Sequence, residues 1–449
     1  MRRIIVASRS LALVALSALL SLLGACQHEA LRDVARPDAG AAGAGGGGGS
    51  PYGVANGGAD GGAPDQVASG GGGSGATDGG DAPPPKPVVY APFQAVDHFF
   101  PTAINADGTV VVGFTYVEDG ANRFQKPALW TAARGITRFP GFEGPDAQGA
   151  AVAVSANGTV AVGEGLKWPT PATSEPLGFD HAVAMSADGS VVAGTATAAT
   201  IFQGQSFRRL GTTNTPIAPL AGDDGTELTA MSADGSTIAG HSWNIAMQEE
   251  RTFVWTAGTA LTEEIVFPGV AEADVLALSA DGSVLAGEAI FGMPAFPGVR
   301  GVTAIRPFRW TRATGVVYMD TGNPQSTARF SGLSADGTTI GAVDGDKAYV
   351  WKGMALATAA PSAAYTFIFG SQLDQSGRTL AVSVQEKLAE GGTGDISVWS
   401  FDGSSLVSID PWGPTRPHFL APGPFSADGH TIAATSHANE GGMVLLTLP

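Results

Sequence analysis

Residues 278–287 read Leu-Ser-Ala-Asp-Gly-Ser-Val-Leu-Ala-Gly, and close variants of this stretch recur along the chain. Its core, an apolar residue followed by Ser-Ala-Asp-Gly, occurs in eight copies if Asn variants and a degenerate copy at 373–377 are included. The copies are 31 to 55 residues apart, and their glycines are Gly108, Gly158, Gly189, Gly235, Gly282, Gly337, Gly377 and Gly429. A phrase repeated at such intervals indicates a repeat architecture.

Each copy predicts a hairpin, because Asp-Gly and Asn-Gly readily supply the positive φ of tight hairpin turns. The flanking stretches, such as 275–279 and 283–287, are apolar on both faces, as in a sheet with neighbours on both sides. A second glycine follows the turn glycine after five residues in five copies: Gly113, Gly163, Gly194, Gly240 and Gly287. We expect close approach of two backbones at these glycines, near a central axis.

A further strand follows most hairpins and carries a tryptophan. The tryptophans are Trp130, Trp168, Trp255, Trp310, Trp351 and Trp399, whereas the third copy has Arg208 and Arg209 instead. Since the tryptophans fall at the same place in each repeat, we interpret them as packing between repeats rather than as a ligand-stacking set. A turn then leads to a fourth strand, as at 314–318. Four strands in about 45 residues, repeated, predict the blades of a β-propeller.

The sequence therefore predicts an all-β fold at 88–449, a β-propeller of eight four-stranded blades. Seven blades are the alternative, because the 31-residue repeat is barely long enough for four strands. The last copy stops after its third strand at 443–448, and an apolar stretch without a partner, 88–93, precedes the first copy. We expect 88–93 to supply the outer strand of the last blade and to close the ring.

The phrase Ser-Ala-Asp-Gly-Ser-Val-Val-Ala-Gly at 186–194 and Phe-Arg-Trp-Thr at 308–311 resemble those of bacterial extracellular HAF-repeat proteins. The resemblance covers about residues 95–449. It implies a secreted or surface location and a propeller-like fold, and it implies no particular reaction.

The N-terminus predicts a lipoprotein signal peptide at 1–25. Three arginines precede a 13-residue apolar run at 11–23, which is too short for a membrane-spanning helix. The stretch Leu-Gly-Ala-Cys at 23–26 resembles the bacterial lipobox, and Cys26 is the only cysteine in the chain. The resemblance implies that Cys26 carries the lipid, and Gln27 after it implies the outer membrane, with the domain at the periplasmic face or the cell surface.

Residues 26–87 are rich in Gly, Ala and Pro and predict a disordered linker, since this composition buries too little apolar surface to offset chain entropy. The formal net charge is −17, which repels phosphate and excludes nucleic acid as a natural partner.

The sequence predicts no catalytic, cofactor-binding or metal-binding site. The chain has no zinc-protease pattern and no pair of histidines with metal-ligand spacing. The seven histidines are scattered and are interpreted as solvated turn residues; His418, His430 and His437 lie close to one another in sequence. The acidic pairs Glu249-Glu250 and Glu263-Glu264 are also expected in solvated turns. The acidic turns at 223–225 and 344–346 lack the twelve-residue calcium pattern.

These observations favour a non-enzymatic binding protein, anchored to a membrane through Cys26, that presents its propeller to a protein or glycan partner. The alternative is a propeller enzyme acting on glycans as a hydrolase or lyase, with a site built from loops at one end of the blades.

Overall fold

The computed structural model describes residues 93–448, apart from 120–121, 145–146, 198–203, 248, 297–298, 361–364, 387–393, 410–419 and 437–440. The predicted signal peptide, Cys26 and the linker at 26–87 lie outside the described residues. The part of the chain that is described consists of strands and their connections, without an α-helix. Accordingly, it contains no helix with the length and apolar character needed to span a membrane.

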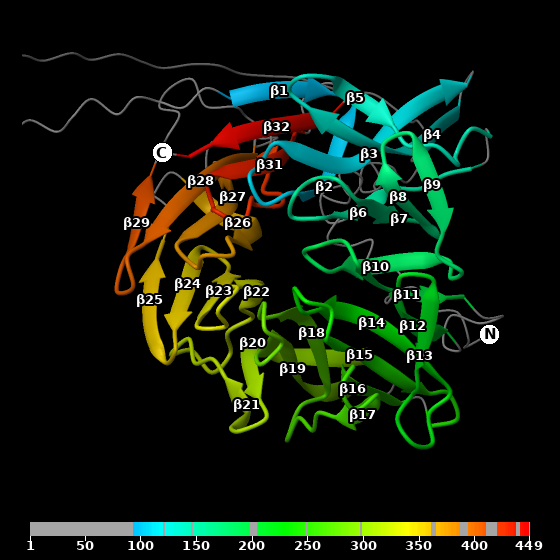
Figure 1. The fold of residues 1–449 in the computed structure, drawn as a ribbon. Coiled ribbons are helices and arrows are strands. Elements are labelled where there is room, and N and C mark those ends of the chain that lie inside the picture. The colour runs from blue at the N-terminus through cyan, green and yellow to red at the C-terminus, as the bar shows by residue number, and fades with distance from the viewer. Residues whose placement is uncertain are drawn as a thin grey trace, which may run out of the picture. The chain divides into compact units, whose positions relative to one another are not determined.

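The strands form eight four-stranded antiparallel sheets, arranged as the blades of a propeller around a ring (Figure 1). Within each of the first seven blades the strands pair in chain order, so the first strand is innermost and the fourth is outermost. The prediction of eight blades is confirmed.

The first four blades include the short repeat that left seven blades open, and it does form four strands. Their strands are β2 (Phe99–Ile104), β3 (Val110–Asp119), β4 (Asn122–Thr131) and β5 (Gly135–Arg138); β6 (Ala151–Val154), β7 (Ala161–Gly163), β8 (Leu166–Thr170) and β9 (Thr173–Pro176); β10 (His181–Met185), β11 (Val191–Ala196), β12 (Gln205–Leu210) and β13 (Thr213–Ile217); β14 (Gly225–Met231), β15 (Thr237–Asn244), β16 (Glu249–Thr256) and β17 (Leu261–Glu264).

The last four blades include the longest hairpin and the strand that closes the ring. Their strands are β18 (Glu272–Leu278), β19 (Leu285–Phe296), β20 (Val299–Thr311) and β21 (Gly315–Tyr318); β22 (Arg329–Leu333), β23 (Thr339–Asp344), β24 (Lys347–Lys352) and β25 (Ala355–Ala359); β26 (Tyr365–Leu373), β27 (Thr379–Glu386), β28 (Gly394–Phe401) and β29 (Leu406–Ile409); β30 (Leu420–Ala421), β31 (Thr431–Ser436), β32 (Gly442–Thr447) and β1 (Phe93–Asp97).

The ring is closed by an N-terminal strand, as predicted, and the described strand begins at the last residue of the predicted range. β1 pairs antiparallel with β32 as the outer strand of blade 8, and its residues are Phe93–Asp97 rather than 88–93. Residues 88–92 lie outside the described part of the chain. Gln94 lies opposite Leu445. Figure 1 shows blue β1 beside red β32.

The repeated phrase forms the turn between the first and second strands of every blade. All eight turn glycines have positive φ, between +69° and +75°. In blade 3 the Ser186 hydroxyl donates to Asp188 Oδ1 at 2.6 Å and accepts the backbone N–H of Val191 at 2.9 Å. Asp188 Oδ1 also accepts the N–H of Ser190 at 2.9 Å. The serine and the aspartate together satisfy the turn's polar groups.

The degenerate copy in blade 7 keeps this network with the two residues exchanged. Asp374 stands where the serine normally lies, and its Oδ1 accepts the N–H of Thr379 at 2.8 Å. Ser376 stands at the aspartate position and donates its hydroxyl hydrogen back to Asp374 Oδ2. The network of this turn is therefore kept when the hydroxyl and the carboxylate exchange places.

The same turns connect one blade to the next. The backbone N–H of the alanine in the phrase donates to the carbonyl oxygen of the matching residue in the following blade, for example from Ala156 to Ala187 and from Ala187 to Ala233, both at 2.7 Å. In the described residues this bond occurs at seven of the eight junctions, and the bond from Ala427 to Ala106 joins blade 8 to blade 1.

The second repeated glycine lies where two backbones come close, as predicted. A Cβ placed on Gly240 would be 2.0 Å from the carbonyl oxygen of Glu227 in the innermost strand of the same blade. The pairing of β14 with β15 shifts register next to this contact, between Leu228 and Ala230. Each such glycine accommodates a β-bulge in the innermost strand.

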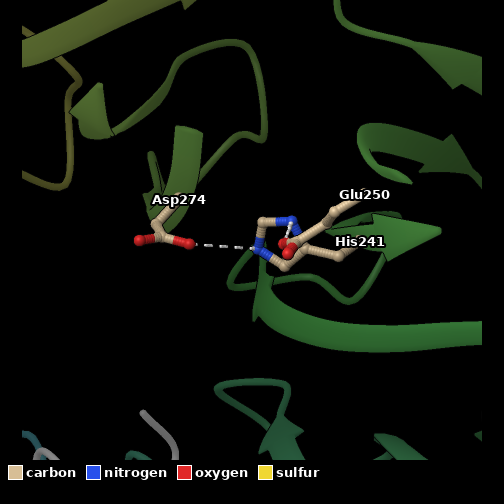
Figure 2. Close-up of side chains that lie close together, drawn as sticks. All are labelled: His241, Glu250 and Asp274. Carbon is tan, nitrogen blue, oxygen red and sulfur yellow. Dashed lines mark ion pairs between the residues drawn. The ribbon is translucent and has the colours of Figure 1, made fainter. Parts of the chain in front are cut away.

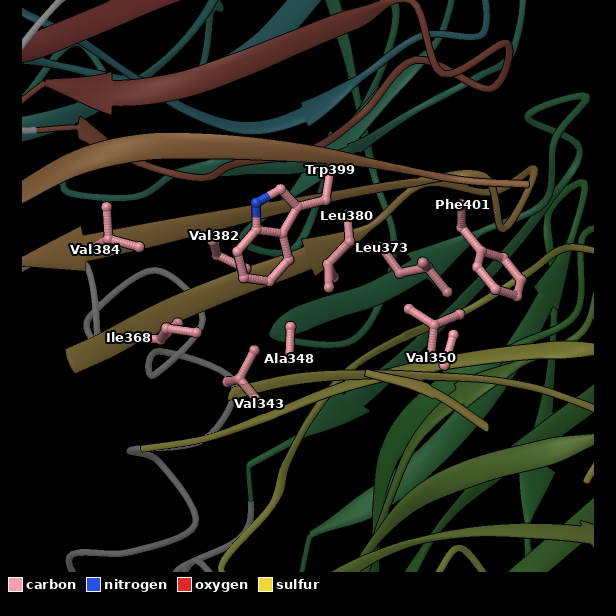
Figure 3. Packing of buried hydrophobic residues seen from close by; sticks show 11 residues of the cluster. Val343, Ala348, Val350, Ile368, Leu373, Leu380, Val382, Val384, Trp399 and Phe401 are labelled. Atoms are coloured by element: carbon pink, nitrogen blue, oxygen red, sulfur yellow. The ribbon is translucent and has the colours of Figure 1, made fainter. Parts of the chain in front are cut away.

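Among the described residues the hydrophobic core divides into eight clusters, one at each blade junction. Figure 3 shows the junction of blades 6 and 7, where Val343 and Val350 face Leu380, Val382 and Trp399. The tryptophans predicted to pack between repeats are all buried, with exposed fractions of 0–8%. In blade 3 Arg209 takes the tryptophan position, opposite Val192.

Candidate functional site

At one end of the blades the same residues recur from blade to blade, and at the other end they differ. The Asp-Gly turns form one end, and the first strand of each blade begins at the other. There, one position of the first strand carries a different polar residue in four consecutive blades: His181, Glu227, Asp274 and Arg329. Its partners on the second strands are Thr195, His241, Glu288 and Val343. Blade-specific side chains thus gather at the end opposite the Asp-Gly turns.

At three junctions the side chain at this position makes an ionic contact with the residue that directly follows the second repeated glycine of the preceding blade. His181 Nδ1 lies 2.5 Å from Glu164 Oε2 between blades 3 and 2. Asp274 Oδ1 lies 3.8 Å from His241 Nε2 between blades 5 and 4. Arg329 Nη1 lies 2.8 Å from Glu288 Oε2 between blades 6 and 5.

His241 is the centre of the most buried of these contacts (Figure 2). Its side chain, on β15, is 6% exposed, and Nδ1 lies 2.6 Å from Glu250 Oε1 on the neighbouring strand β16. The Glu250 and Asp274 side chains are 21% and 14% exposed, so the group reaches solvent on one side. Glu227, half-buried on β14, is the β-sheet partner of His241. Three carboxylates therefore surround one imidazole.

Burial and mutual repulsion shift the protonation equilibria of this group. Burial, together with Glu250 and Asp274, raises the pKa of Glu227 to about 7. Burial, together with Glu250, Glu272 and Glu288, raises the pKa of Asp274 to about 6. For His241 burial opposes the charged form, but Glu250, Asp274 and Glu227 together raise its pKa to about 9. Near neutral pH the charged form of the imidazole is therefore favoured.

Two of the three carboxylates and the imidazole can act as metal ligands. One ligand atom each from His241, Glu250 and Asp274 can be chosen so that all lie within 4.8 Å of one another. By contrast, Glu288 at the next junction is occupied by protein donors, since Oε1 accepts the N–H of Phe330 at 2.7 Å and Oε2 pairs with Arg329.

The acidic turns considered for calcium are likewise engaged by the protein itself. Asp223 pairs with Arg251 at 2.8 Å, and Asp224 Oδ2 accepts the N–H of Ile245 at 2.8 Å. The Asp344 carboxylate accepts hydrogen bonds from Ser326 and Thr327.

The prediction that Glu249-Glu250 and Glu263-Glu264 lie in solvated turns is wrong. Glu249 and Glu250 begin β16. Glu250 pairs with Trp243, two residues beyond His241 on β15, so its side chain lies on the same face as His241 and packs against it. Glu263 and Glu264 lie on β17, where they pair with Arg312 and Arg251.

The interpretation of His241 as a solvated turn residue is also wrong, since it is 5% exposed within a strand. One signal was available in the sequence: His241 directly follows Gly240, which fixes it inside a second strand. His430 is exposed, and His418 and His437 lie outside the described residues. Cys26, the predicted lipid attachment site, is outside them as well.

The sequence matches no protein-family model and no curated protein. Among solved structures, the Dos1 propeller is 11% identical with a TM-score of 0.49, and the match covers 80% of this chain and 95% of that one. An oligogalacturonate lyase of Vibrio parahaemolyticus is 9% identical with a TM-score of 0.44, over 79% of this chain and 90% of that one. A chain of the mitotic checkpoint complex is 12% identical with a TM-score of 0.40, over 81% and 93%. The likeness to these structures concerns the fold.

Proposed function

We propose that the protein is a non-enzymatic binding module of the cell envelope, whose propeller binds a protein or glycan partner at the end opposite the Asp-Gly turns. One observation carries the proposal: a single strand position changes from His181 to Glu227, Asp274 and Arg329 over four consecutive blades. Different side chains at equivalent backbone positions of rigid strands can provide binding specificity.

The end formed by the Asp-Gly turns has fewer polar side chains available to bind a partner. Its polar side chains are used within the turns, as the Ser186 and Asp188 contacts illustrate. The other end presents side chains with free surface, since His181 and Arg329 are 54% and 59% exposed. Exposed, varied polar side chains around a ring suit the recognition of an extended or branched partner.

We further propose that lipid on Cys26 holds the protein at the outer membrane, which follows from the lipobox resemblance. In a bacterial host, Cys26→Ser should lose labelling by a lipid precursor and should leave the membrane fraction. Undiminished labelling of the variant would contradict lipid attachment at this residue.

The binding proposal is tested with the full chain on a glycan array and by capture of envelope proteins. We expect a ligand retained by the parent and lost from a His181→Ala, Arg329→Ala double variant. The matched control is Met354→Ala, which removes a 68% exposed side chain from the hairpin of β24 and β25 at the Asp-Gly end. Equal loss in both variants, or no loss in the double variant, would contradict the proposed face.

A second candidate, a glycan hydrolase or lyase, is favoured by one observation. Carboxyl groups with pKa values raised to about 7 at Glu227 and about 6 at Asp274 are suited to proton transfer near neutral pH. Release of new reducing ends or unsaturated products from envelope polysaccharides, abolished in Glu227→Gln and kept in Met354→Ala, would favour this function over simple binding.

A further inference from the structure

The group around His241 differs from the two other ionic junctions in its balance of charge. Between blades 2 and 3 one imidazole meets Glu164, and between blades 5 and 6 one guanidinium meets Glu288. At the junction of blades 4 and 5, His241 is the only basic group among the described residues whose charges act on Glu227 and Asp274. Several carboxylates thus share one positive charge in a largely buried place, and a bound cation would offset their mutual repulsion.

One nitrogen of the His241 imidazole also lacks a hydrogen-bond partner. His241 Nδ1 is buried and makes no hydrogen bond within the described residues, although Glu250 Oε1 lies only 2.6 Å away. The oxygen is close but outside the direction in which the ring nitrogen donates. His181 Nδ1, at 2.5 Å from Glu164, does have hydrogen-bond geometry. The His241 contact is therefore close without forming a directed hydrogen bond.

We propose that His241, Glu250 and Asp274 bind a divalent transition-metal cation, Mn²⁺ or Zn²⁺, at the junction of blades 4 and 5. One imidazole nitrogen with carboxylate oxygens is a donor set that suits these ions better than Mg²⁺ or Ca²⁺, which favour oxygen alone. Metal–ligand bonds of about 2.0–2.2 Å bring ligand atoms to within about 4.4 Å of each other, so the observed spread of 4.8 Å needs only a small closure.

Metal binding balances the charge of the group. The dication replaces the proton of His241, which is released to solvent. With the neutral imidazole and the carboxylates of Glu250 and Asp274, the charges of the site then sum to zero. Because Glu250 and Asp274 are partly exposed, the ion has a path from solvent. The inference is independent of the proposed partner, since metal binding is measured without one.

The test uses the full chain, stripped with a chelator and exchanged into chelator-free buffer. Calorimetric titration with Mn²⁺ and with Zn²⁺ should give about one bound ion per chain for one of them, and bound metal should raise the melting temperature. Glu250→Gln and Asp274→Asn should each weaken binding at least tenfold. The matched control is His181→Gln, which removes the other histidine–glutamate junction and should bind metal like the parent.

Absence of stoichiometric binding of either ion to the parent would overturn the site. Equal affinity in the parent and both carboxylate variants would overturn it as well, because the bound ion would then lie elsewhere. Folding of the variants is checked by circular dichroism in chelator. Should a variant fail to fold, pulsed electron paramagnetic resonance of the Mn²⁺-loaded parent decides: coupling to an imidazole nitrogen, kept in His181→Gln, is expected, and a spectrum without it would contradict ligation by His241.

Discussion

The backbone N–H of Ala427 in the last blade donates a 3.0 Å hydrogen bond to the carbonyl oxygen of Ala106 in the first. The same bond links neighbouring blades through the Asp-Gly turns around the ring, so the repeated phrase forms both the hairpin and the junction. Pairing of β1 with β32 closes the same junction at the outside of the ring.

Ring closure predicts a disulfide between engineered cysteines at Gln94 and Leu445, in a Cys26→Ser background. These residues are opposite each other in the antiparallel pair, where Cα atoms are about 4.5–5.5 Å apart, within the range of a disulfide. Oxidation should give a species of altered mobility on a non-reducing gel.

Gln94→Cys combined with Val444→Cys is the control, because the two side chains then point to opposite faces of the sheet. Efficient crosslinking of this shifted pair, or none at Gln94 and Leu445, would contradict the register of β1.

Replacing a turn glycine by alanine should destabilise the protein more where the turn packs against the neighbouring blade than where it is open. Gly235 has φ of +69°, and a Cβ there would lie 2.6 Å from Val191 Cβ in the preceding blade. Strain and overlap together should lower the free energy of unfolding by about 2–4 kcal/mol. Gly211 has φ of +60° with no atom within 4 Å of such a Cβ, so Gly211→Ala should cost only about 1 kcal/mol.

Urea denaturation of the two glycine variants measures this difference. Equal losses would mean that the Asp-Gly turns do not pack against the neighbouring blade.

The turn aspartates predict loss of stability in acid. Hydrogen bonds from Ser186 and Ser190 lower the pKa of Asp188 to about 2, and the pKa values of Asp107, Asp234, Asp281 and Asp428 are lowered for the same reason. A lowered pKa in the folded state stabilises it above the unfolded pKa of about 3.9, and this contribution is lost as pH falls through the folded value. The loss should therefore occur between about pH 4 and pH 2.

Asp188→Asn isolates this effect, since Asn157 fills the same position in blade 2 and accepts the N–H of Thr159 at 3.1 Å. The parent should melt at a higher temperature than the variant, and this difference should be larger at pH 7 than at pH 2. A difference that is constant with pH would contradict the assignment.

The buried tryptophans predict unequal costs for the same substitution. Trp255 and Trp351 are each 2% exposed at equivalent positions. Trp351 Nε1 donates to the carbonyl oxygen of Asp320 at 3.1 Å, whereas Trp255 Nε1 has no hydrogen-bond partner in the described residues. Trp351→Phe should therefore destabilise the protein by about 1 kcal/mol more than Trp255→Phe, measured by urea denaturation. An equal or reversed order would contradict the bonding pattern.

The repeat phrase was sufficient to predict eight blades, because its information is local. Asp-Gly specifies a turn within a few residues, and the serine two residues before the aspartate satisfies the same turn. The burial of the tryptophans followed from their recurrence at one place in the repeat. Closure by an N-terminal strand was predicted, but its register was not, because the apolar character of 88–93 does not specify which residues lie opposite each other; pairing with β32 places Gln94 opposite Leu445.

The group around His241 was not predictable in this way. Glu227 and Asp274 occupy the same position of two repeats, eight residues before the turn glycine, but no motif links them to His241 and Glu250. The four residues lie on four strands of two blades. The turns specify each hairpin, and the order of the blades follows from the chain. Which side chains meet between blades depends on the angle and register at which one sheet packs on the next, and side-chain packing over the whole junction determines both. The sequence by itself determined the repeated hairpins and their number, whereas the contact of His241 with Asp274 exists only because blade 5 packs against blade 4.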